Sequence, residues 1–215
     1  MKNQKKDEDM TKPKSEIVRK GYDKIAKAYH EQRNMYQSKA LLTKFSKQLP
    51  KNAKIIDLGC GAGVPVAKFL VGKGHKVTGI DFADGMIKLA KKNVPKARFL
   101  KMDITKMKFK RGEFDAAVSF YAIIHIPREK HAGIYKKLHQ ILKPNGIMLL
   151  NTCGSDANGW IGYQKDYLGV PMCWSFYSPK KTSKIIKDAG FKILWSKVLK
   201  LSGEKQFWVL AKNQK

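Results

Sequence analysis

No apolar run in the sequence reaches the roughly 20 residues that a membrane-spanning helix needs. The charged N-terminus also lacks the apolar segment of a secretory signal. We therefore expect a cytoplasmic protein with no membrane partner. Cysteine is scarce too, and the three present, Cys60, Cys153 and Cys173, are widely spaced. Their odd number and spacing suit a reducing compartment and offer neither a disulfide framework nor a metal-ligand pattern.

Acidic residues and arginine are few for a chain of this charge. The chain carries 44 Lys+Arg against 17 Asp+Glu, for a net charge of +27, but only five of the basic residues are arginine. A charge of this size favours a nucleic-acid partner. Arginine, however, is the better ligand for phosphates and base edges, and the lysines are spread along nearly the whole chain. We therefore rank nucleic acid below a small molecule as the partner.

Strand and helix patterns alternate along the chain, which at 215 residues and 43% hydrophobic content can form one domain with a good core. Strands are expected at residues 54–58, 76–81, 97–101, 114–120, 147–151, 191–199 and 206–212, and helices at 39–49, 66–72, 83–93, 128–142 and 179–189. This alternation predicts a doubly wound α/β fold whose mostly parallel sheet ends in an antiparallel hairpin. Residues 1–14 are polar and are expected to be a disordered tail, so that 15–215 form a single domain.

The most informative segment is I-I-D-L-G-C-G-A-G at residues 55–63. An apolar run ends in Asp57, and glycines follow at alternate positions. A second apolar run ends in Asp81, 22 residues after Gly59. This pattern is typical of a strand, a glycine turn, a helix and a second strand, across whose tips a nucleoside can bind. A carboxylate at the second strand tip can accept hydrogen bonds from a ribose diol.

The D-L-G-C-G-A-G sequence resembles motif I of the class I S-adenosylmethionine-dependent methyltransferases, and Asp81 resembles the ribose-binding acid of that family. The resemblance covers the chain from about residue 18 to residue 211. It implies a Rossmann-like sheet of seven strands, with the last inserted antiparallel. It also implies S-adenosyl-L-methionine as the cofactor and S-adenosyl-L-homocysteine as the product. Asp57 would then order the glycine loop and help to hold the ammonium group of the cofactor.

The same resemblance implies further cofactor contacts. Asp103 and Ile104 match the family's adenine contact, through a carboxylate and a backbone N–H, although Asp103 could instead cap its own loop. Phe82 would lie against the adenine or belong to the core. The cofactor-binding residues expected from these arguments are Tyr29, Arg33, Asp57, Gly59, Gly61, Gly63, Asp81, Phe82, Met86, Asp103, Ile104 and Phe120.

Residues 21–29, with the sequence G-Y-D-K-I-A-K-A-Y, resemble the N-terminal helix of many small-molecule methyltransferases of this class. In those enzymes the helix folds over the cofactor as a lid, so residues 15–50 are expected to form a helical lid. Tyr29 would then close on the methionine end, and Arg33 would meet its carboxylate. A packed surface helix is the alternative.

The acceptor side is expected at the tip of the strand at residues 114–120 and in residues 153–178. Phe120 and Tyr121 could contact the sulfonium through cation–π interactions. His125 is a titratable base at this edge and would act as a general base or shape the pocket. Residues 153–178 are rich in glycine and aromatic residues, typical of an acceptor-side insertion or of a hydrophobic mini-core. The catalytic candidates are His125 and Tyr121, and the substrate-binding candidates are these two with Trp160, Tyr163, Met172, Trp174 and Tyr177.

These features predict a methyltransferase that acts on a small, apolar or aromatic metabolite by in-line displacement. Such a reaction depends mainly on aligning the nucleophile with the methyl group. The chain lacks the N/D-P-P-Y/F signature of amino-methylating DNA and protein enzymes, which further lowers the rank of nucleic acid as acceptor. The alternatives are an RNA or protein methyltransferase, which the basic surface suggests, and a non-catalytic module that binds S-adenosylmethionine.

Overall fold

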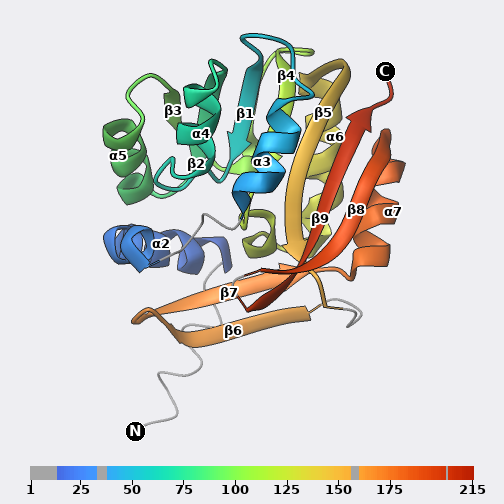
Figure 1. The fold of residues 1–215 in the computed structure, drawn as a ribbon. Helices are drawn as coiled ribbons and strands as arrows, with labels where there is room; N and C mark the ends of the chain where they lie inside the picture. The colour runs from blue at the N-terminus through green and yellow to red at the C-terminus, as the bar shows by residue number, and fades with distance from the viewer. Residues whose placement is uncertain (1–13, 33–37, 156–159, 202) are drawn as a thin grey trace, which may run out of the picture.

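A computed structural model of the chain describes residues 14–32, 38–155, 160–201 and 203–215 (Figure 1). The tail predicted at residues 1–14 therefore lies outside the described residues, except for Lys14, which begins a helix. Seven strands form one sheet in the order β3-β2-β1-β4-β5-β9-β8, and two further strands form a separate antiparallel pair. This order, with helices on both faces, confirms the predicted Rossmann-like fold.

The first five strands of the large sheet run parallel to one another. They are β1 (Lys54–Leu58), β2 (Lys76–Asp81), β3 (Arg98–Lys101), β4 (Phe114–Ser119) and β5 (Leu142–Cys153). β9 (Glu204–Asn213) lies between β5 and β8 (Phe191–Leu201) and is antiparallel to both. The terminal antiparallel hairpin is therefore confirmed. β5 is longer than predicted because its pairing with β4 already starts at Leu142.

Alternate residues of each buried strand face opposite layers of the protein. Ile55 of β1 packs with α3 (Lys39–Ser46), α4 (Val66–Gly72) and α5 (Asp84–Asn93). Ile56 packs in a second core with α6 (His131–Ile141) and α7 (Pro179–Asp188). Short 3-10 turns, η2 (Ile104–Lys106), η3 (Ile123–His125) and η4 (Arg128–Lys130), follow β3 and β4. The sheet is thus covered on both sides, and its strand tips remain as the place for a ligand.

A third cluster of buried residues lies at the carboxyl ends of the parallel strands. Helix α2 (Lys14–Gln32) crosses this edge of the sheet and packs against α5 and β7 (Figure 1). Gly21 permits the close approach to β7, because a Cβ there would lie 3.2 Å from the Pro171 carbonyl oxygen. None of the helices in the described ranges is long and apolar enough to cross a membrane.

The segment at residues 153–178 differs from the irregular insertion that its composition suggested. Most of it forms a hairpin of β6 (Trp160–Tyr167) and β7 (Val170–Phe176), which lies beyond α2 at the same end of the sheet (Figure 1). Its β-branched residues are few, and its glycines favoured a loop. The burial of most of β7 against α2 is a tertiary effect that local composition does not reveal.

Candidate active site

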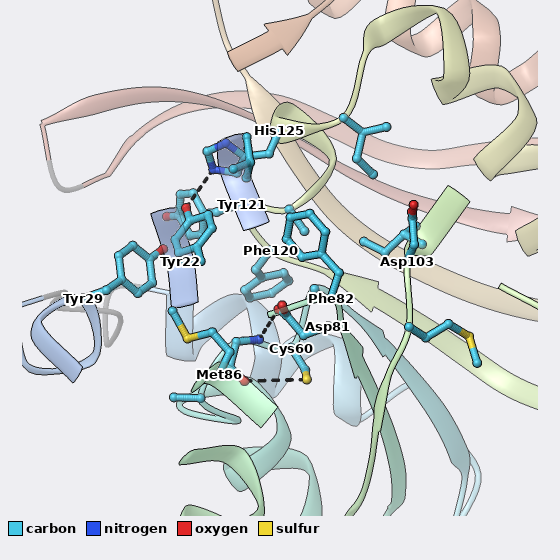
Figure 2. A pocket seen from close by; sticks show the side chains of 18 of the residues that line it. Tyr22, Tyr29, Cys60, Asp81, Phe82, Met86, Asp103, Phe120, Tyr121 and His125 are labelled. Atoms are coloured by element: carbon cyan, nitrogen blue, oxygen red, sulfur yellow. Dashed lines mark hydrogen bonds between the residues drawn. The ribbon is translucent and has the colours of Figure 1, made fainter. Parts of the chain in front are cut away.

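A cavity of about 530 Å³ lies at the strand tips, beneath α2. Its lining comes from α2, the glycine loop after β1, and the residues that follow β2, β3 and β4. Figure 2 shows Asp81, Cys60 and Met86 in one part of the cavity and Tyr22, Tyr121 and His125 in another. A volume of roughly 300–1,000 Å³ is typical of small-molecule sites.

The glycine loop requires a backbone that other residues adopt only with strain. Gly59 and Gly61 have φ values of 68° and 51° and both line the cavity. A Cβ on Gly59 would lie 2.2 Å from the Cβ of Ala122, so the loop can pass this close only with glycine. At Gly61 the nearest atom to such a Cβ is the Met86 sulfur, at 4.0 Å. The backbone at Gly61 is therefore open to a ligand.

Gly63 has a different environment from the other two glycines. Its φ is 75°, and a Cβ there would lie 3.1 Å from the Phe99 ring and 3.3 Å from Val94. The cavity lining includes Gly59 and Gly61 but not Gly63. Gly63 therefore allows close packing under the loop, and its expected contact with a cofactor has no support in this geometry.

Asp81 ends β2 and connects the loop to the cavity. Its Oδ2 accepts a hydrogen bond from the Gly61 N–H at 3.0 Å, and its Oδ1 accepts one from the Ala83 N–H at 3.0 Å. Burial raises the pKa of Asp81 to about 6, although the backbone hydrogen bonds act in the opposite direction. A carboxylate has about four acceptor positions, so Asp81 can still accept from ligand hydroxyls besides the backbone N–H groups of Gly61, Phe82 and Ala83.

Asp57 lies behind the loop rather than in the cavity wall. It is 2% exposed, and its Oδ2 has no hydrogen-bond partner among the described residues. Burial, and then the charge of Asp81, raise the pKa of Asp57 to about 8. A positive charge bound near the loop would therefore favour the ionised form of Asp57.

Asp103 and Ile104 both line the cavity, but Asp103 also caps its own turn. Its Oδ1 accepts hydrogen bonds from the N–H and the hydroxyl of Thr105, at 2.7 and 2.8 Å. The expected capping role therefore holds for Oδ1 of this carboxylate, whereas Oδ2 makes no such hydrogen bond to Thr105. Phe82 and Met86 also line the cavity.

Tyr22, His125 and Cys173 form a hydrogen-bonded chain at the other end of the cavity. His125 Nδ1 lies 2.9 Å from the Cys173 carbonyl oxygen, and Nε2 lies 2.8 Å from the Tyr22 hydroxyl (Figure 2). Because a carbonyl only accepts, Nδ1 carries a proton, and in the neutral ring Nε2 accepts from Tyr22. The site therefore includes Tyr22, which the sequence placed only within the lid helix. Its spacing of seven residues from Tyr29 was the available signal.

Phe120 and Tyr121 follow β4 and line the cavity next to this chain. Tyr121 has a φ of 60°, in the left-handed region that a bulky side chain rarely adopts. Tyr29 also lines the cavity, with its ring centroid 5.2 Å from that of Tyr22. Arg33, which was expected beside Tyr29, lies outside the described residues.

Tyr163, Met172 and Trp174 of the hairpin, and Tyr177 after it, are not among the described residues that line the cavity. Trp174 packs against the His125 ring, with centroids 5.6 Å apart, and Met172 is fully buried against α2. Tyr163 is partly buried in the same cluster as Met172. The guanidinium carbon of Arg128 lies 5.3 Å from the centroid of the Tyr177 ring. This packing favours the mini-core alternative, and the direct substrate contacts expected of these four residues stay a prediction. Trp160 belongs to β6, and its side chain is outside the described part.

The fold and the cavity define a Rossmann-like domain with a ligand site at its strand tips. Residues 55–146 match the family model of a methyltransferase domain. The putative methyltransferase YqeM of Bacillus subtilis is 30% identical over 157 residues, which are 69% of this chain and 63% of that protein. The phosphoethanolamine N-methyltransferase of Plasmodium falciparum is 26% identical over 156 residues, which are 71% of this chain and 58% of that protein. The chain therefore spans less than two thirds of either relative.

A solved structure of the 1,6-didemethyltoxoflavin-N1-methyltransferase of Burkholderia thailandensis, with 1,6-didemethyltoxoflavin and S-adenosylhomocysteine bound, has a similar fold. The TM-score is 0.70 at 17% identity, over 94% of this chain and 89% of that one. At this identity the likeness concerns the fold. Together with the methyltransferase-domain match, it supports the resemblance found in the sequence. Residues 55–146 thus carry a methyltransferase domain, and the chain is similar to S-adenosylmethionine-dependent methyltransferases.

Proposed function

We propose that the protein transfers a methyl group from S-adenosylmethionine to a small acceptor with an apolar or aromatic body. The observation that carries this proposal is one cavity with two chemically different ends. One end offers the glycine loop and Asp81, and the other offers tyrosine rings and His125. A cofactor and an acceptor need such an arrangement, because they must meet within a single water-poor space.

The residues that would hold the cofactor follow from their chemistry. Asp81 would accept from the ribose hydroxyls, the Gly61 backbone would lie along the methionine end, and Asp57 would compensate the ammonium charge from behind the loop. Asp103 and Ile104 would hold the adenine. When bound, S-adenosylmethionine supplies a methyl carbon on a positively charged sulfur, and the C–S bond breaks as the acceptor's lone pair bonds to that carbon.

Helix α2 supports catalysis by closing the cavity. Asp23 on this helix accepts a hydrogen bond from the Gly85 N–H, in the first turn of α5, at 3.0 Å. On the same helix, Tyr22 bonds to His125. The helix is therefore attached to both ends of the cavity, and it would exclude water while the reactants are aligned. Alignment of this kind can lower a barrier by roughly 7–11 kcal/mol.

The Tyr22–His125 pair can accept a proton from an acceptor that must lose one. The proton would pass to the Tyr22 oxygen as its own hydroxyl proton passes to His125 Nε2. The resulting imidazolium would keep its Nδ1–H bond to the Cys173 carbonyl oxygen, which holds the ring in place. General base catalysis of this kind typically contributes 10²–10⁴-fold.

The acceptor end favours a small molecule over a macromolecule. Ile126 and Pro127 line it with Tyr29 and Tyr121, so its walls suit an apolar or planar body. The cavity lies beneath α2, and a long polymer would have to pass under this helix. The net charge of +27 nevertheless makes RNA the natural competitor.

Label transfer from methyl-labelled S-adenosylmethionine would test the proposal. The purified protein is incubated with metabolite, RNA and protein fractions of its source cell, each in parallel. We expect label in the metabolite fraction, in amounts that change little with salt. Label in RNA, lost steeply as salt rises, would support the alternative acceptor. Cofactor binding without label in any fraction would support the non-catalytic module.

A further inference from the structure

The conformation of Tyr121 needs an explanation outside the cavity. A tyrosine at a φ of 60° is strained and persists only where surrounding contacts hold it. The residue lies two positions after the end of β4 and lines the cavity. Whatever holds its backbone therefore sets the position of a ring in the wall of the site.

A buried amide holds that backbone. Asn151 of β5 accepts a hydrogen bond from the Tyr121 N–H at 2.7 Å, and it is 1% exposed. The Asn151 Nδ2 in turn donates to Gln206 Oε1 on β9, at 3.3 Å. Strands β5 and β9 are paired at this level of the sheet. The contact thus extends from the cavity wall to the inserted antiparallel strand.

The direction of each amide in this chain is fixed by its partners. The Trp208 indole N–H can only donate, and it donates to Gln206 Oε1 at 3.1 Å. Asn151 must therefore present its NH₂ to Gln206, which leaves its oxygen for the Tyr121 N–H. The Trp208 ring also packs edge-on against Phe120, with centroids 4.7 Å apart and an interplanar angle of 88°. One buried network thus contacts both Phe120 and Tyr121.

We propose that Asn151, Gln206 and Trp208 are positioning residues, which fix the Phe120 and Tyr121 rings so that they face the charged sulfur of the cofactor. The inference rests on the proposed function, because it assigns the rings a cationic ligand. Aromatic faces attract a cation more strongly than a neutral thioether. The network should therefore govern how strongly the site prefers S-adenosylmethionine over S-adenosylhomocysteine.

The test compares the dissociation constants of S-adenosylmethionine and S-adenosylhomocysteine, each measured by titration calorimetry. Asn151→Ala removes the acceptor of the Tyr121 N–H, and Tyr121→Ala removes the ring itself. Both should lower the preference for S-adenosylmethionine by roughly three- to tenfold. Thr152→Val is the matched control: Thr152 is a buried neighbour on β5 whose hydroxyl has no partner among the described residues. Its preference should equal that of the wild type.

A second variant covers the case in which Asn151→Ala does not fold. Gln206→Met keeps Asn151 but removes the acceptor that orients it, and we expect the same direction of change. A folded Asn151 or Gln206 variant with the wild-type preference would overturn the inference, as would an unchanged preference in Tyr121→Ala.

Amide exchange separates this inference from the proposed function. The Tyr121 N–H should exchange slowly in the wild type and at least tenfold faster in the folded Asn151→Ala or Gln206→Met variant, whichever ligand binds. Equal exchange would contradict the role of the network. If the wild type binds neither cofactor form, the proposed function fails, and the exchange experiment still decides whether the network holds Tyr121.

Discussion

Replacement of Asp81 by alanine is the most direct perturbation of the cofactor end. The carboxylate accepts from the backbone N–H groups of Gly61, Phe82 and Ala83, and it retains acceptor capacity for ligand hydroxyls. Alanine removes both kinds of bond at once. Asparagine in the same place keeps a single acceptor oxygen and loses the charge.

The expected loss follows from the number of bonds. A hydrogen bond to a charged group contributes about 1.5–3 kcal/mol. Two ribose hydroxyls on Asp81, counted at the low end because water can replace part of the contact, give about 3 kcal/mol. This corresponds to a roughly 150-fold weaker affinity for S-adenosylhomocysteine. Asp81→Asn should lose about tenfold, or half of that free energy.

Titration calorimetry of S-adenosylhomocysteine measures this loss. Lys91→Ala, an exposed position on α5 away from the cavity lining, is the control and should bind like the wild type. Thermal unfolding of each variant verifies that the fold is intact. Folded Asp81→Ala with the affinity of Lys91→Ala would refute the assignment of Asp81 to the ribose.

The pH dependence gives a second view of the same residue. Because the pKa of Asp81 is raised to about 6 in the ligand-free protein, part of the population is protonated at pH 5–6 and must lose that proton to accept both hydroxyls. Affinity of the wild type should therefore rise through this range, and proton release should accompany binding. Asp81→Asn should lack this rise.

Three further predictions concern the acid behind the loop, the lid and the glycine turn. The folded-state pKa of Asp57 is about 8 against 3.8 for the unfolded chain, so the folded state binds the extra proton and stability falls as pH rises between these values. The melting temperature of Asp57→Asn should therefore rise relative to that of the wild type between pH 5 and pH 8. A constant difference between the two melting temperatures would contradict the raised pKa of Asp57. Tyr22→Phe and His125→Gln should leave cofactor affinity within about twofold but slow transfer to a proton-losing acceptor by roughly 10²-fold or more; weakened affinity with unchanged turnover would disprove the relay. Gly59→Ala, whose Cβ would lie 2.2 Å from that of Ala122, should cost roughly 2 kcal/mol or more and several degrees of melting temperature, whereas a wild-type melting curve would exclude this loop geometry.

The sequence predicted the parts of the site whose chemistry is local. A glycine turn between two strand-terminal acids restricts the backbone through φ alone, and Gly59, Gly61 and Asp81 accordingly lie together at one end of the cavity. The order of the sheet was predictable for a similar reason, since alternating helices and strands allow few connections.

The parts that depend on tertiary contacts were not predictable in this way. Tyr22 lies 103 residues from His125 in the chain, and the resemblance of its helix to a lid did not indicate this contact. Asn151 and Gln206 belong to β5 and the inserted β9, which pair with each other although they are far apart in the chain. The hairpin of β6 and β7 is specified by its packing on α2, which composition does not record.

The central claim is that the cavity holds the adenosyl group between Asp81 and the tyrosines. A crystal structure of the protein grown with saturating S-adenosylhomocysteine tests it most directly. We expect the ribose hydroxyls within hydrogen-bonding distance of the Asp81 carboxylate and the thioether sulfur toward Tyr121. A cavity without the nucleoside at saturation, or a ribose bound away from Asp81, would contradict the account.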